Sequence, residues 1–282
     1  MFQTRYCNLF YYSQMSLVLL GMILTGSVGF VLRSGTSWQV ILLVGLSTFF
    51  TYSIDNLIDW HKDRAHNEKI APLIQSYHKL TYILIPLSGL GVIFLVKQSH
   101  HVLNIGMLLL GAAVALGTTR FSTYQSNSSN AKQTVLSFTV NRVFITFVWT
   151  SVCIFLPMWY ENISPTDETW RTFIYIFNLI FTYAILWKLE KSPLEVTKRI
   201  INSELPNIVS MLLLFSMGLV IFDVITGNLP TTNLINLLPP AANLIAVKLI
   251  TQNPTSLRQK ISLLSMALIL IIAVSVILHL AI

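Results

Sequence analysis

The sequence has few charged residues and almost no cysteine. Only 10% of its 282 residues are Asp, Glu, Lys or Arg, whereas 54% are hydrophobic. A soluble domain carries about 25% charged residues, so this composition excludes an ordinary soluble protein and indicates an integral membrane protein. Cys7 and Cys153 are the only cysteines, which excludes a disulfide framework and a thiolate metal site. P-loop, G-x-S-x-G and dinucleotide-binding patterns are also missing from the sequence.

Nine apolar segments reach or nearly reach the length of about 20 residues that a helix needs to cross a bilayer. They cover residues 10–32, 38–60, 79–97, 102–118, 134–156, 170–188, 207–226, 234–252 and 262–281. The first segment lacks a signal-peptide cleavage pattern, so we expect it to be retained as a span. We therefore predict an all-α polytopic membrane protein, with residues 1–282 forming one transmembrane domain.

The net charge of +7 is distributed unevenly between the two sides of these predicted spans. Fourteen Lys and Arg residues belong to the N-terminus and to the loops after spans two, four, six and eight, and only three belong to the opposite loops. Such a bias marks the cytoplasmic side. We predict that the N-terminus is cytoplasmic (or on the stromal or matrix side) and that the C-terminus lies across the membrane. This distribution also indicates contact with the lipid bilayer and no nucleic-acid partner.

Three of the 11 acidic residues lie together at the end of the second span, namely Asp55, Asp59 and Asp63. A spacing of four residues puts them on one helix face, with a drift of about 40° per step. Like charges at this spacing destabilise a helix, and ionisable groups at membrane depth are costly. A divalent cation such as Mg²⁺, which prefers hard oxygen ligands and bridges to phosphate, would offset both costs. The alternative is a helix end whose acids are solvated.

Asn141 and Arg142 lie about two turns inside the cytoplasmic end of span five. An Arg at this depth either meets an anionic ligand or an acid in the bundle interior or snorkels towards the interface. Apolar residues on both sides favour the interior. Arg64, in the predicted loop after span two, is a candidate contact for a diphosphate, and a solvated loop is the alternative.

A second charged segment follows span six and contains Glu190 and Glu195. These residues form either a second metal-binding arm or part of an ordinary ion-paired helix, because Glu195 precedes Arg199 by four residues.

Three further residues or pairs bear on the ends of the predicted spans. Pro72 is expected to interrupt any helix before span three, and Pro239–Pro240 is expected to kink or break span eight. Asp223, near the far end of span seven, is predicted to be interfacial.

This arrangement resembles the UbiA-type intramembrane prenyltransferase superfamily, whose members carry Asn-Asp-x-x-Asp-x-x-x-Asp after the second span and Asp-x-x-x-Asp after the sixth. Here the first motif reads Asp55-Asn56-Leu57-Ile58-Asp59-Trp60-His61-Lys62-Asp63, with its first two residues exchanged. In the second position only Glu190 and Glu195 are present, five residues apart. The resemblance covers the whole predicted topology, but of the two motifs only the first is matched well.

The resemblance implies a helix bundle around a central cavity open to the cytoplasmic side. It also implies an enzyme that transfers an isoprenoid from a prenyl diphosphate to a lipophilic acceptor such as an aromatic ring, with Mg²⁺ as cofactor. The implied catalytic and metal-binding residues are Asp55, Asp59 and Asp63, joined at the metal by Glu190 and Glu195. The implied substrate-binding residues are Asn56, Arg64, Lys132, Asn141, Arg142 and Lys188.

Three other functions stay open. Terpene cyclisation is possible on the same fold, and so is a non-catalytic relative that binds an isoprenoid or another lipid. A transporter is less favoured, because transporters place unusual charges near the midplane of paired repeats, whereas here they gather at one face.

Overall fold

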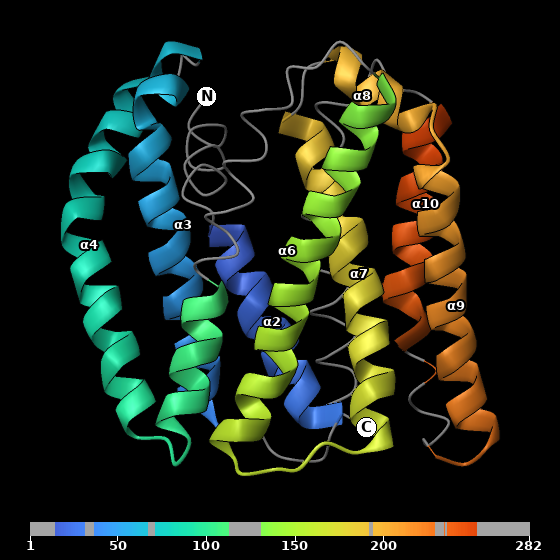
Figure 1. The fold of residues 1–282 in the computed structure, drawn as a ribbon, viewed down its shortest axis with the longest axis horizontal. Coiled ribbons are helices and arrows are strands. Elements are labelled where there is room, and N and C mark those ends of the chain that lie inside the picture. The colour runs from blue at the N-terminus through green and yellow to red at the C-terminus, as the bar shows by residue number, and fades with distance from the viewer. Residues whose placement is uncertain are drawn as a thin grey trace. The chain divides into compact units, whose positions relative to one another are not determined.

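The computed structural model describes residues 15–31, 37–66, 71–112, 131–191, 194–228, 234 and 236–252. Within these ranges the regular structure is helical, without any strand, as the composition predicts. The helices are α2 (Met15–Val31), α3 (Trp38–His66), α4 (Ala71–Lys97), Val102–Ala112, α6 (Ala131–Tyr160), α7 (Asp167–Lys191), α8 (Leu194–Ile201), α9 (Leu205–Ile225) and α10 (Leu238–Gln252) (Figure 1). The predicted span 262–281 lies outside the described residues.

Pro72 and the pair Pro239–Pro240 lie at the starts of helices. Pro72 lies in the first turn of α4, and Pro239–Pro240 lies in the first turn of α10. The missing N–H of proline does no harm there, because the first turn has no intrahelical partner for it. The α-helix in predicted span eight therefore begins only at Leu238, beside its prolines, whereas α4 continues from Ala71 into span three without the interruption predicted at Pro72.

Among the described residues, four helical segments are long and apolar enough to cross a membrane: Lys79–Lys97, Phe138–Tyr160, Asp167–Leu186 and Leu205–Ile225. Four other apolar helices are shorter, at Leu17–Val28, Trp38–Ile54, Val102–Ala112 and Leu238–Thr251. Large apolar side chains on α4 and α9 point outward, among them Leu90, Phe94, Met211 and Phe222, each at least 57% exposed. Such an outward apolar surface is typical of helices that face lipid.

The chain divides into two compact units, and unit 1 comprises residues 1–110 and 152–164. In unit 1, α3 packs between α2 and α4. Glycines permit the close approach: a Cβ on Gly45 would lie 2.7 Å from the Met22 sulfur, and one on Gly91 would lie 2.8 Å from a Leu46 methyl. Small residues at helix interfaces serve this purpose in membranes.

The turn after α6 is held to two other segments of unit 1. The backbone N–H of Ser37, before α3, donates to Glu161 Oε1 at 3.1 Å. His101, before helix Val102–Ala112, has its Nε2 2.9 Å from Asn162 Oδ1. These side-chain contacts fix the ends of helices that are far apart in sequence.

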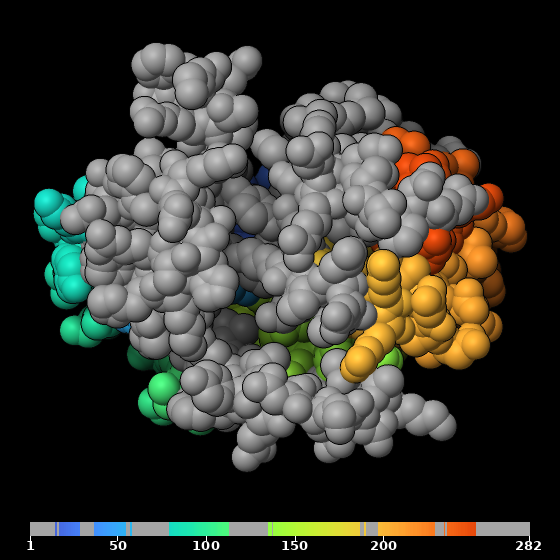
Figure 2. All heavy atoms as spheres, turned by 90° about the horizontal axis from the view of Figure 1, so that it is seen from above, coloured from blue at the N-terminus to red at the C-terminus, as the bar shows by residue number. Residues whose placement is uncertain are grey.

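Unit 2 comprises residues 111–151 and 165–282, and its core lies among α6, α7, α8, α9 and α10. The buried apolar residues of this core include Phe138, Phe181, Ile185, Leu213 and Val247. At one end of unit 2, α8 packs on α9 and α7, and its atoms are exposed beside those of α9 and α10 (Figure 2).

At the start of α7, Arg171 Nε lies 3.1 Å from Asp223 Oδ1 on α9. Asp223 lies in the last turn of α9 and is only 7% exposed; its interfacial position stays a prediction. Asn228 Nδ2 also donates to Asp223 Oδ1, at 3.3 Å. A buried carboxylate is stabilised by a paired cation and hydrogen bonds of this kind.

Candidate functional site

The acidic positions at 55, 59 and 63 belong to one unbroken helix. The apolar part of α3 covers Trp38–Ile54, and the same helix continues to His66. The three positions therefore follow the i, i+4, i+8 register predicted from the sequence and span about 12 Å along the helix axis. Their side chains lie outside those that the structure describes.

Asn56 and Arg64 belong to the same helix. The predicted loop around Arg64 was wrong, because residues 61–66 contain neither Gly nor Pro and continue α3. Polar residues sustain a helix as well as apolar ones, so hydropathy alone placed the end of this helix too early. Lys132 likewise lies in the first turn of α6, which begins three residues before the predicted span five, 134–156.

The second charged segment covers the end of α7 and most of α8. Lys188 and Glu190 lie in the last turn of α7, and Glu195 lies in α8. The buried Thr197 Oγ1 donates to the Leu189 carbonyl at 3.1 Å and so ties α8 to the end of α7. Glu190 and Glu195 are therefore carried by different helices, and their side chains lie outside the described ones.

Arg142 is buried inside a membrane-length helix. Its side chain is 6% exposed, and that of the adjacent Asn141 is 8% exposed. The guanidinium carbon lies 5.9 Å from the centre of the Phe138 ring, one turn earlier in α6, within the range of a cation–π interaction. The prediction that Arg142 lies in the interior is confirmed.

Thr146, a polar residue near Arg142, was not predicted from the sequence as part of the site. Thr146 follows Arg142 by one turn of α6, and its side chain is fully buried. Its Oγ1 has no hydrogen-bond partner among the described residues. The i+4 spacing from Arg142 was the available signal, but threonines are common in helices and usually bond to their own backbone.

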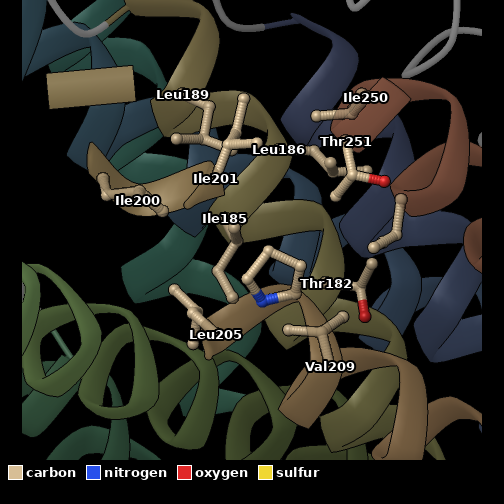
Figure 3. Close-up of a pocket in the computed structure, with 12 residues that line it drawn as sticks. Thr182, Ile185, Leu186, Leu189, Ile200, Ile201, Leu205, Val209, Ile250 and Thr251 are labelled. Atoms are coloured by element: carbon tan, nitrogen blue, oxygen red, sulfur yellow. The ribbon is translucent and has the colours of Figure 1, made fainter. Parts of the chain in front are cut away.

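A small apolar pocket lies elsewhere in unit 2, under α8 (Figure 3). It holds about 20 Å³ of space, which is roughly enough for one water molecule. Its polar side chains are hydroxyls already bonded to backbone carbonyls: Thr182 Oγ1 donates to Asn178 O and Thr251 Oγ1 to Lys248 O. Its walls come from α7, α8, α9 and α10: Thr182, Ile185, Leu186, Leu189, Ile200, Ile201, Leu205, Pro206, Val209, Val247, Ile250 and Thr251. This pocket offers nothing that would bind a charged ligand.

The described side chains do not bring three or more His, Cys, Asp or Glu groups together as a metal site. The five predicted metal ligands are not among those side chains. Their residue types are nevertheless suitable, because carboxylate oxygens are the ligands that Mg²⁺ prefers. Comparison of the chain with protein-family models, curated proteins and solved structures finds no significant match.

Proposed function

We propose that this protein is a multi-pass membrane enzyme that transfers an isoprenoid from a prenyl diphosphate to a lipophilic acceptor. In this proposal about nine spans form a bundle around a cavity open to the cytoplasmic side, where the N-terminus lies. The observation that carries the proposal is the unbroken course of α3 beyond its apolar part. This course keeps three carboxylate positions in register immediately beyond the apolar part of α3.

The donor set fits Mg²⁺, because carboxylates are hard oxygen ligands. Asp55, Asp59 and Asp63 would hold one ion, and Glu190 with Glu195 would hold a second. When bound, Mg²⁺ supplies positive charge that neutralises the phosphates and makes diphosphate a better leaving group.

Basic and amide groups of the chain bind the rest of the diphosphate in this proposal. The buried Arg142 guanidinium retains its charge at any physiological pH, so an anionic ligand is a suitable partner for it. Asn141 presents an amide beside it. Asn56, Arg64, Lys132 and Lys188 supplement them from the ends of α3, α6 and α7.

The test is diphosphate release by the purified full-length protein. The protein is incubated with Mg²⁺ and a panel of prenyl diphosphates, with and without an aromatic acceptor. Asp59→Asn is expected to lower the release rate about 100-fold, equivalent to about 2.7 kcal/mol of transition-state stabilisation. The matched control is Asp167→Asn, which removes an exposed carboxylate at the start of α7 and should leave the rate within about twofold of wild type.

Diphosphate release that survives Asp59→Asn would remove the catalytic proposal. Release without any acceptor, together with a cyclic hydrocarbon product, would instead identify the chain as a terpene cyclase.

A further inference from the structure

The buried side of α6 in unit 2 is unusually polar for a membrane-length helix. Arg142, Thr146 and Thr150 follow one another at intervals of four residues, and each is at most 6% exposed. The outward side chains of the same stretch are apolar, including the exposed Val143 and Phe147. Polar residues inside the membrane face a bundle interior or a water-filled cavity, so this stripe marks the inner face of α6.

The Thr146 hydroxyl differs from other threonines in the described helices. Thr139, Thr150 and Thr182 each donate Oγ1–H to the carbonyl four residues earlier, at 2.8–2.9 Å. For Thr146 that acceptor would be the Arg142 carbonyl, yet Thr146 Oγ1 has no hydrogen-bond partner among the described residues. A buried hydroxyl without a partner is costly, and its easiest partner is left unused. The Thr146 hydroxyl is therefore available to donate a hydrogen bond to a bound molecule.

The neighbouring groups indicate the charge of that molecule. Residues four apart on a helix have Cβ atoms about 5–6 Å apart, so Thr146 adjoins Arg142 on the helix surface. The guanidinium carbon itself lies towards Phe138, 5.9 Å from the centre of that ring, so a ligand that meets both groups must span more than one turn of α6. Asn141 adds a second buried polar group at the same level of the helix. A cation and a hydroxyl on one buried stripe, with a buried amide on the adjacent residue, suit an anion with several acceptor oxygens.

We propose that the Thr146 hydroxyl donates a hydrogen bond to a phosphate oxygen of a diphosphate group held by Arg142. This inference rests on the proposed function for the isoprenoid part of the ligand. The recognition of the phosphate groups depends only on residues of α6. Thr146 then selects for phosphorylated isoprenoids over the free alcohols, because an alcohol offers no anionic oxygen to either side chain.

The experiment measures ligand binding and not turnover. Purified full-length protein in lipid nanodiscs is titrated with inorganic pyrophosphate, farnesyl diphosphate and farnesol. Thr146→Val keeps the side-chain shape and removes the hydroxyl, and Thr146→Ser keeps the hydroxyl. Thr150→Val is the matched control, because Thr150 is equally buried and its hydroxyl is already bonded to the Thr146 carbonyl.

Thr146→Val should weaken the binding of farnesyl diphosphate and pyrophosphate by about tenfold or more, the effect of losing a hydrogen bond to a charged group. Thr146→Ser and Thr150→Val should stay within about threefold of wild type, and farnesol binding should not change. If Thr146→Val does not fold, Thr146→Ala replaces it, with its unfolding midpoint measured without ligand.

Three results would overturn the inference. One is diphosphate binding that is unaffected by Thr146→Val, as expected if the hydroxyl bonds only to a trapped water. A second is an equal loss in Thr150→Val, and the third is a wild-type protein that binds neither phosphate compound. Binding that depends on Thr146 in a protein without turnover would uphold this inference and defeat the catalytic proposal.

Discussion

Asn178 illustrates how a polar side chain is accommodated between two helices of unit 2. Its Nδ2 donates to the Leu212 carbonyl at 3.1 Å and to Ser216 Oγ at 2.8 Å, and the residue is 2% exposed. Ser216 Oγ in turn donates to the Leu212 carbonyl at 3.0 Å. The Asn178 amide therefore joins α7 to α9 through hydrogen bonds that lipid cannot replace.

Replacing Asn178 by Leu should destabilise the protein. The change removes both interhelical hydrogen bonds at roughly constant volume, and such bonds in membranes contribute about 0.6–1.7 kcal/mol. We expect the free energy of unfolding to fall by about 1–2 kcal/mol, measured by titration with a denaturing detergent. Asn207→Leu is the control, since Asn207 is exposed on α9 and its Nδ2 donates to the nearby Glu204 of the same chain segment. Equal losses in the two variants would contradict this role for Asn178.

Single residues also show which features of the site could be predicted from the sequence and which could not. The burial of Arg142 was predictable, because its neighbours in the sequence are apolar and a charge among them must face inward. The burial of Asp223 was not, because its partner Arg171 is 52 positions away in the sequence and only the packing of α7 on α9 joins them. Thr146 was missed since nothing in a sequence tells whether a helical hydroxyl bonds to its own backbone.

At the scale of helices, hydropathy located the segments well and their ends poorly. Predicted spans at 38–60 and 79–97 correspond to helices over Trp38–His66 and Ala71–Lys97. Hydropathy reports the length of apolar sequence, whereas a helix continues as long as its backbone hydrogen bonds do. The extra turns of α3, residues 61–66, carry Asp63 and Arg64, so this error falls on one end of the candidate site.

The packing of α3 on α4 depends on glycine at one point of contact. A Cβ on Gly91 would meet Leu46 at 2.8 Å, whereas a Cβ on Gly218 of α9 would have no atom within 4 Å. Gly91→Val should therefore lower the free energy of unfolding by about 1–3 kcal/mol through overpacking. Gly218→Val, which has open space, should change it by less than about 1 kcal/mol. Denaturant titration of both variants would measure the difference. If Gly91→Val lowers the free energy of unfolding by less than Gly218→Val does, α3 and α4 separate easily to admit the larger side chain.

For the whole molecule, the number of membrane crossings is the quantity that decides between topologies. Nine spans place three crossings between Lys97 and Lys198, because Val102–Ala112 then belongs to a span that reaches residue 118. The four helices of full membrane length in the described part of the chain place two crossings there, at Phe138–Tyr160 and Asp167–Leu186. An odd number puts the two lysines on opposite sides of the membrane, and an even number puts them on the same side.

Labelling of single cysteines distinguishes the two topologies. Lys97 and Lys198 are both exposed, so Lys97→Cys and Lys198→Cys, each in a chain without Cys7 and Cys153, should react with a membrane-impermeant maleimide. The bias of Lys and Arg places Lys198 on the cytoplasmic side. We therefore expect Lys97→Cys to be labelled in intact cells and Lys198→Cys only after permeabilisation. Labelling of both from one side would remove the crossing near residues 102–118, and with it the parity that puts residues 55–63 and 190–195 on the same face of the membrane.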